Sequence, residues 1–141
     1  MGDILFKEVF QVERGSFDTA GDASASIKRT LKKMGVDNAI VREVAISSYE
    51  LELNLVIHSM GGELSVEFTP DKLSLISTDV GPGIPDIDLA LQEGYSTAPE
   101  NVRNLGFGAG MGLPNIKRHC REFFIDSAEG RGTVIKAIYN L

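Results

Sequence analysis

An antiparallel hairpin in the middle of the chain sets the strongest limit on what this sequence can fold into. Apolar and polar residues alternate through residues 64–69, which is typical of a strand with one buried face. Pro70 and Asp71 then form a turn, so residues 72–78 should return as the antiparallel partner strand. Helical patterns precede this hairpin and further strand patterns follow it, which favours a two-layer α/β sandwich.

The other expected elements complete that architecture. Apolar residues at helical spacing predict helices over residues 18–34 and from residue 37 or 38 to about 59. A short helix suits residues 87–92, and Pro114 sits well in the first turn of another that runs to about residue 122. Strands are expected over residues 4–12, 123–127 and 133–140. The sequence thus predicts one α+β domain over residues 1–141, with a mostly antiparallel mixed sheet covered on one face by helices.

Charge and cysteine content exclude several classes of protein. Fourteen Lys and Arg against twenty Asp and Glu give a net charge of −6, which argues against general affinity for nucleic acid or anionic membranes. The one cysteine, Cys120, excludes an internal disulfide, and His58 and His119 form no close metal-binding pair. The absence of a signal-peptide pattern and of a long apolar run makes the cytoplasm the expected compartment.

A polar stripe runs along the second expected helix. Glu50, Asn54 and His58 are spaced four residues apart, and such residues lie on one face of a helix. If this stripe lines a polar cleft, a carboxylate there could act as a general base and an amide oxygen could bind Mg²⁺. The same spacing also fits a solvated helix face, and the stripe alone favours that simpler interpretation.

An aspartate follows the hairpin and is accompanied by two glycines. Asp79 precedes Gly81 and Gly83 at the end of an expected strand. In this position a carboxylate can accept a hydrogen bond from a ligand that approaches the backbone closely, such as the exocyclic amine of adenine. A simple turn that uses the aspartate to close a strand end remains the alternative.

Glycines also punctuate the stretch from residue 94 to residue 112. Four of them, Gly106, Gly108, Gly110 and Gly112, alternate with other residues just before Leu113 and Pro114. Such glycines let backbone N–H groups converge on phosphate oxygens at a helix N-terminus. The spacing is neither that of a dinucleotide-binding loop nor that of a P-loop, and a flexible hinge or lid is an alternative compatible with phosphate binding.

A last glycine pair lies between the two final expected strands. Gly130 and Gly132 suit a hairpin turn, and the hydroxyl of Thr133, at the start of the last strand, could still face a ligand pocket.

Taken in chain order, these four motifs resemble the N, G1, G2 and G3 boxes of the GHKL ATPases, the superfamily of gyrase, Hsp90, histidine kinases and MutL. The resemblance covers about residues 5 to 140. Within the superfamily the chain looks most like the small anti-sigma-factor serine kinases of bacterial partner-switching modules. The resemblance implies the Bergerat ATP-binding fold, with ATP and Mg²⁺ as cofactors and an ATP lid at about residues 94–112.

The resemblance also implies a role for each matching residue. Asn54 would coordinate Mg²⁺, and Glu50 would be the catalytic base that takes the proton of the attacking hydroxyl. Asp79 would accept the adenine amino group, with Thr133 nearby. Gly83 would let the adenine lie against the backbone. His58 would line the phosphate end of the site. The phosphates themselves would be bound by Gly108, Gly110, Gly112 and the N–H of Leu113.

The resemblance implies two main candidate functions and a third alternative. The first is an ATP-dependent protein serine/threonine kinase that phosphorylates a STAS-domain antagonist protein. The second is a nucleotide-gated binding switch that sequesters a sigma factor or activates a phosphatase without catalysis. A plain ATPase or detached sensor-kinase module is the third. The sequence also leaves open whether the chain forms a homodimer, which apolar strand residues such as Val9 and Phe10 could mediate edge to edge.

Overall fold

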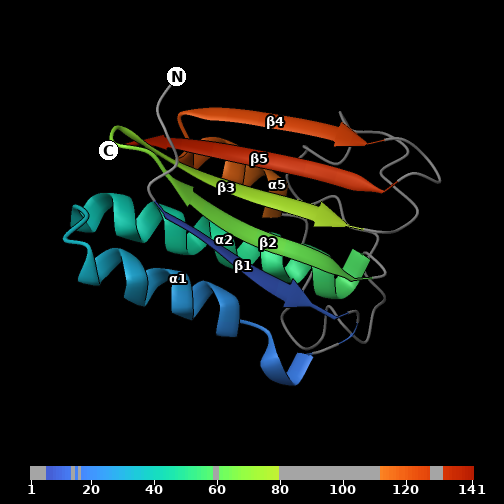
Figure 1. The fold of residues 1–141 in the computed structure, drawn as a ribbon. Coiled ribbons are helices and arrows are strands. Elements are labelled where there is room, and N and C mark those ends of the chain that lie inside the picture. The colour runs from blue at the N-terminus through green and yellow to red at the C-terminus, as the bar shows by residue number, and fades with distance from the viewer. Residues whose placement is uncertain (1–5, 14, 16, 59–60, 80–111, 128–131) are drawn as a thin grey trace.

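Two layers, a sheet and a set of helices, make up the part of the chain that the structure describes (Figure 1). The computed structural model describes residues 6–13, 15, 17–58, 61–79, 112–127 and 132–141. The helix expected over residues 87–92 and nearly all of the glycine-rich stretch up to residue 112 lie outside these ranges.

The sheet contains five strands in the order β1-β2-β3-β5-β4, and each of the described pairings is antiparallel. The strands are β1 (Phe6–Val12), β2 (Gly62–Phe68), β3 (Lys72–Asp79), β4 (Glu122–Ser127) and β5 (Thr133–Asn140). The predicted hairpin is confirmed as β2 and β3, since the Thr69 N–H donates to the Lys72 carbonyl at 2.9 Å across the Pro-Asp turn.

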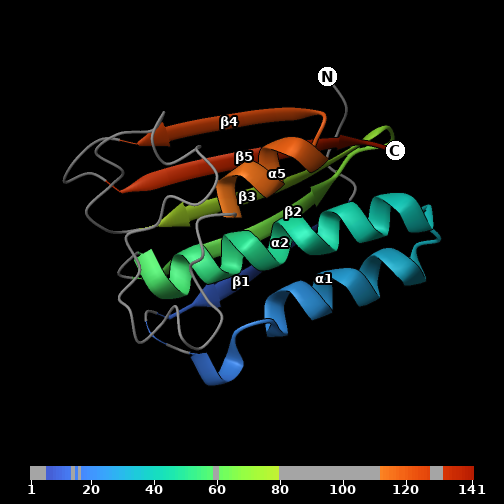
Figure 2. The same ribbon diagram turned by 180° about the vertical axis from the view of Figure 1, so that it is seen from behind.

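The helices α1 (Asp22–Lys33), α2 (Asn38–His58) and α5 (Gly112–His119) all lie on one face of the sheet (Figures 1 and 2). Helix α2 lies between the other two and packs against both. The predicted two-layer α+β architecture is therefore confirmed. Within the described residues, no helix combines the length and apolar character that a membrane span requires.

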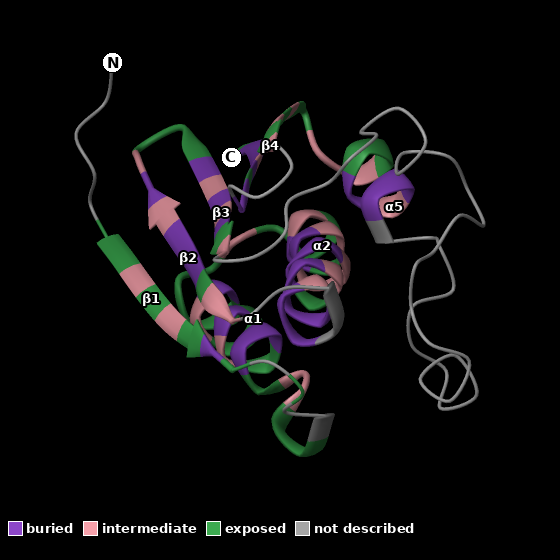
Figure 3. Ribbon diagram, turned by 90° about the vertical axis from the view of Figure 1, so that its right-hand side faces the viewer, coloured by how far each residue is buried: buried purple, intermediate pink, exposed green. Residues whose placement is uncertain are grey.

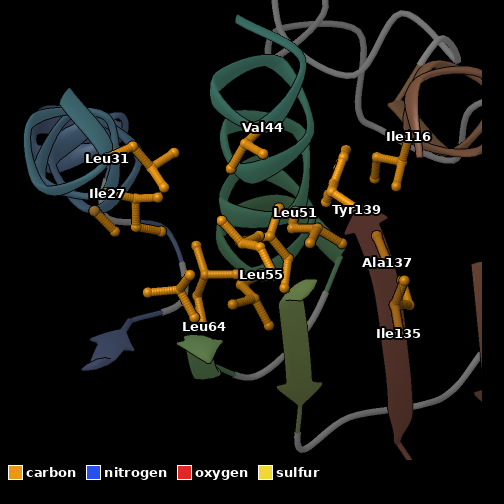
Figure 4. Close-up of a cluster of buried hydrophobic side chains, with 14 of the residues drawn as sticks. Ile27, Leu31, Val44, Leu51, Leu55, Leu64, Ile116, Ile135, Ala137 and Tyr139 are labelled. Atoms are coloured by element: carbon orange, nitrogen blue, oxygen red, sulfur yellow. The ribbon is translucent and has the colours of Figure 1, made fainter. Parts of the chain in front are cut away.

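The hydrophobic core lies between the two layers. Figure 4 shows side chains from α1, α2, α5 and the sheet meeting there, among them Leu31, Leu55, Ile116 and Ile135. Helix α2 is buried on several sides because it faces the sheet, α1 and α5 at once. This position explains why apolar residues do not keep to one stripe of α2, as they do on a helix with a single buried face.

Strand β1 forms one edge of the sheet and is largely exposed or half-buried (Figure 3). Val9 is 45% exposed on this edge strand, whereas Phe10 is half-buried and packs against the core. Of the two residues considered for a dimer contact, only Val9 is thus well exposed.

Two predicted helix boundaries are wrong. The helix expected from residue 18 begins at Asp22, because a separate 3-10 turn (Phe17–Thr19) precedes it and Gly21 has a left-handed φ of 103°. The helix containing Pro114 ends at His119 instead of near residue 122. The chain turns there because the Arg121 N–H donates to the Ile138 carbonyl at 2.8 Å, which brings the chain beside β5 as β4 begins.

A buried carboxylate from another helix caps the N-terminus of α1. The N-cap residue Gly21 offers no side-chain acceptor, and the N–H groups of Ala23 and Ser24 instead donate to the two oxygens of Glu52, at 3.2 and 3.1 Å. Glu52 belongs to α2 and is only 3% exposed. A carboxylate at a helix N-terminus satisfies N–H groups that lack partners inside the helix and faces the positive end of the helix dipole. Glu52 therefore fixes α1 to α2.

We expect Glu52→Ala to lower the free energy of unfolding by about 2 to 4 kcal/mol, because two buried N–H groups lose a charged acceptor. Urea denaturation followed by circular dichroism measures this change. Glu122→Ala, at an exposed position, is the control and should shift stability by less than about 0.5 kcal/mol. Equal losses for the two variants would show that the cap contributes nothing.

Candidate active site

The polar stripe predicted on the second helix lies on α2, and its Glu50 lies near Asn115 of α5. Glu50 and Asn54 are one helical turn apart and both are partly buried, among the buried residues Leu51, Leu53 and Leu55. His58 is the last residue of α2, and its side chain lies outside what the structure describes. Partial burial distinguishes Glu50 and Asn54 from an ordinary solvated helix face.

The carboxylate of Glu50 lies near Asn115 of α5. Burial raises the pKa of Glu50 above its ordinary value, and a hydrogen bond from the Asn115 side chain acts in the opposite direction. The carbonyl oxygen of Asn115 in turn accepts a hydrogen bond from Nη1 of Arg118 at 3.3 Å. Arg118 thus holds the Asn115 amide within α5, close to Glu50 of α2.

Asp79 is the last residue of β3, and the first residue of β5 holds its side chain. The Thr133 N–H donates to Oδ1 of Asp79 at 2.8 Å. Burial raises the pKa of Asp79, with this hydrogen bond opposing the shift. The hydroxyl of Thr133 lies 2.7 Å from Oγ of Ser127 and is buried. The direct contact of Thr133 with Asp79 is therefore made by its backbone.

Two glycines let the backbone close around Asp79. A Cβ atom added at Gly132 would lie 2.5 Å from the carbonyl oxygen of Asp79, and one added at Gly62 would lie 2.8 Å from its Cα. Gly132 also has a left-handed φ of +77°, which strains any other residue. Only glycine fits these positions without a shift of the backbone that carries the aspartate.

These pieces gather toward one end of the sandwich. The end of α2, the end of β3 and the start of β5 lie there together (Figures 1 and 2). Gly112 is the first residue of α5, and the Leu113 side chain that follows is buried in the core. Gly83, Gly108 and Gly110 lie outside the described residues.

The donor chemistry of α2 suits Mg²⁺. Asn54 offers an amide oxygen one turn from the carboxylate oxygens of Glu50, and Mg²⁺ prefers oxygen ligands. Across the described ranges, no three His, Cys, Asp or Glu side chains gather closely enough to hold a metal by themselves. A Mg²⁺ ion at Asn54 would therefore take its other ligands from water and from a phosphorylated ligand, as this ion commonly does.

The sequence pattern did not predict the roles of four residues in this region. Asn115 and Arg118 form a hydrogen bond on α5, and Gly62 and Gly132 allow the backbone to approach Asp79 closely. A weak signal existed for the first two, because positions 115 and 118 are spaced i, i+3 on a helix and so lie on one face. The glycine pair predicts a turn at Gly132, whereas its close approach to Asp79 depends on the pairing of β3 with β5.

Comparison with known proteins identifies the family. The model of the histidine kinase-, DNA gyrase B- and HSP90-like ATPases matches residues 36–140. The chain belongs to this family, and the resemblance drawn from the four motifs is confirmed.

Individual relatives place the chain more closely. It is 32% identical over 115 residues to the serine/threonine-protein kinase RsbT of Bacillus subtilis, which covers 79% of this chain and 80% of that protein. It is 32% identical over 99 residues to the anti-sigma F factor of Pasteuria penetrans, covering 65% of this chain and 63% of that protein. Among solved structures, a chain of the SiaB-SiaC complex from Pseudomonas aeruginosa has the same fold, with a TM-score of 0.64 at 13% identity, covering 96% of this chain and 89% of that one.

Gly132→Ala tests the close approach of the backbone at Gly132 to Asp79. We expect it to lower the free energy of unfolding by at least about 2 kcal/mol more than Gly35→Ala, as judged by urea denaturation. Gly35 is a matched control because its φ of +76° is nearly the same, while a Cβ there meets nothing within 4 Å. The difference between the variants therefore isolates the clash with Asp79, and equal losses would contradict the proposed close approach.

Proposed function

We propose that this chain is an ATP-dependent protein serine/threonine kinase that phosphorylates a STAS-domain antagonist protein in a bacterial partner-switching module. The likeness to the kinase RsbT over four fifths of the chain supports the activity. The observation that carries the proposal is the half-buried Glu50 carboxylate, held at the α2–α5 junction one turn from Asn54. A domain that only binds nucleotide has no need of such a base.

Nucleotide recognition is assigned to the end of the sandwich that holds Asp79. With Oδ1 engaged by the Thr133 N–H, the second carboxylate oxygen can accept a hydrogen bond from the adenine amino group. Gly83 would let the adenine ring approach the backbone. The phosphates would be bound by backbone N–H groups at Gly108, Gly110, Gly112 and Leu113, with His58 nearby, where the start of α5 adds partial positive charge.

A magnesium ion held by Asn54 would neutralise part of the charge of the triphosphate. The rest of the chemistry is assigned to Glu50. The serine or threonine oxygen of the partner attacks the γ-phosphorus, its proton passes to the Glu50 carboxylate, and the bond from the γ-phosphorus to the β–γ bridging oxygen breaks to release ADP. The raised pKa of Glu50 suits this role, because a more basic carboxylate accepts a proton more readily.

Glu50→Ala should abolish phosphotransfer while leaving ATP binding near normal, since the base contributes to the chemical step and not to nucleotide affinity. A loss of about 10²- to 10⁴-fold in rate is expected. The assay follows transfer of the labelled γ-phosphoryl group to purified STAS-domain proteins from the same genome. Glu43→Ala, two turns earlier on α2, is the control and should transfer normally. Full-rate transfer by Glu50→Ala would remove Glu50 from the mechanism.

Asn54→Ala should weaken the binding of Mg-ATP by about 10-fold or more, because the metal loses its protein ligand. Calorimetric titrations with ATP, once with Mg²⁺ and once with EDTA, separate the metal-dependent part of the affinity. The loss should appear only with Mg²⁺. Asn140→Ala, at an exposed position near the end of β5, is the matched control. An unchanged affinity for Mg-ATP in Asn54→Ala would contradict the ligand role.

A second candidate function is a nucleotide-gated binding switch, and the relatives named anti-sigma F factor favour it. Such a switch sequesters a sigma factor or engages a phosphatase, and the nucleotide needs only different affinities for two conformations. The Glu50→Ala variant separates the two functions. A switch keeps ATP-dependent capture of its partner and its biological effect without the base, whereas a kinase loses the effect together with phosphotransfer.

A further inference from the structure

Helix α1 has a strongly basic exposed face. Lys28, Arg29, Lys32 and Lys33 are all exposed, opposite the side of the helix that packs into the core. These four residues are called the basic face below. Helix α2 separates α1 from α5, so neither of the other two described helices covers the outer side of α1 (Figure 2). Within the part of the chain that the structure describes, none of the four side chains forms an ion pair.

The positive charge is concentrated on an otherwise acidic chain. Residues 23–42 contain five Lys or Arg, the fifth being the exposed Arg42 near the start of α2, and one acidic residue, Asp37. The remaining residues contain nine Lys or Arg against nineteen Asp or Glu. The basic face is therefore a local feature, and the net charge of −6 conceals it.

The basic face does not stabilise the helix that carries it. Lys28 with Lys32, and Arg29 with Lys33, are like charges four residues apart, a spacing at which they repel each other on a helix. The last turn explains Lys32 and Lys33, because cations there interact favourably with the helix dipole. Lys28 and Arg29 lie in the middle of α1 and lack this benefit. Their presence indicates a role outside the fold.

The basic face also lies away from the candidate active site. Gly21 is next to Tyr49 of α2, since a Cβ atom at Gly21 would lie 3.5 Å from the Tyr49 ring. Helices α1 and α2 run in opposite directions (Figure 1). From the level of Tyr49, Lys28 therefore lies about 10 Å toward the start of α2, and Asn54 lies about 8 Å toward its end. At this separation the basic face does not bind the phosphates of a nucleotide held at Asn54.

We propose that the basic face of α1 is a docking surface for an acidic patch on the protein substrate, an inference that rests on the proposed kinase function. Complementary charge steers the encounter of two proteins and fixes their orientation. Met34, which follows the basic face, is 49% exposed and offers an apolar contact beside the charges. A partner domain of about 100 residues has a radius of gyration of about 13 Å, so it is wide enough to contact α1 and present its hydroxyl at Glu50.

An acidic protein fits this face better than a nucleic acid or an anionic membrane. Helix α1 is only about 18 Å long, whereas duplex DNA and a lipid surface are negative over much larger distances. Their charge would extend over the acidic remainder of the chain and be repelled there. A protein can confine its acidic residues to the area that faces α1.

The test introduces Lys28→Glu together with Arg29→Glu in the full chain. The KM for the STAS-domain substrate should rise by about 10-fold or more, because attraction becomes repulsion, while kcat and the Kd for Mg-ATP change by less than about twofold. The control is Lys72→Glu with Arg121→Glu, which makes the same change in net charge at two exposed positions outside α1. An equal rise in KM for both double variants would overturn the inference, because it would show an effect of net charge alone.

A neutral variant, Lys28→Gln with Arg29→Gln, removes the charges without adding new ones. It should raise KM by about threefold or more and make KM less sensitive to NaCl than in the wild type, since salt screens exposed charges. Circular dichroism shows whether each variant is folded, and the neutral variant decides if the charge-reversed one is not.

Two results would overturn the inference while leaving the kinase function intact. The first is transfer with an unchanged KM in both variants. The second is wild-type binding to a short DNA duplex or to phosphatidylglycerol vesicles that the neutral variant loses, with KM unchanged. Absence of any transfer by the wild-type chain would instead refute the kinase function, and the docking surface for its substrate would fall with it.

Discussion

The buried carboxylate of Glu52 is the contact on which the arrangement of the helices depends. Glu52 accepts two hydrogen bonds at the start of α1, whereas the buried hydroxyls of Ser47 on α2 and Tyr139 on β5 have no hydrogen-bond partner within the described residues. A buried N–H group without an acceptor costs about 1 to 3 kcal/mol, so this carboxylate stabilises the junction between α1 and α2. The two hydrogen bonds therefore fix how α1 lies against α2, the helix that also carries Glu50 and Asn54.

The architecture was predictable from the sequence where the pattern is local. Alternation over residues 64–69 and the Pro-Asp turn gave the β2–β3 hairpin, and the helical spacing of Ala23, Ile27 and Leu31 gave the buried face of α1. Helix boundaries were harder. The start of α1 depends on a left-handed Gly21 and on an acceptor supplied by another helix, and neither is visible in the spacing of apolar residues.

The site could be predicted only as a set of residues, and not as a set of contacts. Motif order marked Asp79 and Thr133, yet their contact runs through a backbone N–H from 54 positions away, and residue identity does not encode that pairing. Asn115 could not be predicted for the same reason, because its closeness to Glu50 depends on how α5 packs beside α2. Gly62 and Gly132 belong to this class as well, since their lack of a side chain matters only once β3 lies between β2 and β5.

The place of β5 in the sheet also bears on how the protein is made. This strand leaves the ribosome after the other four, yet it lies inside the sheet, between β3 and β4. Until it is synthesised, the backbone groups along one side of β3 have no strand to pair with, and an open strand edge of this kind invites association with other chains. The nascent protein must therefore pass through an incomplete sheet in which the Thr133 N–H is not yet present to hold Asp79, and the proposed nucleotide site can form only after translation has passed residue 133.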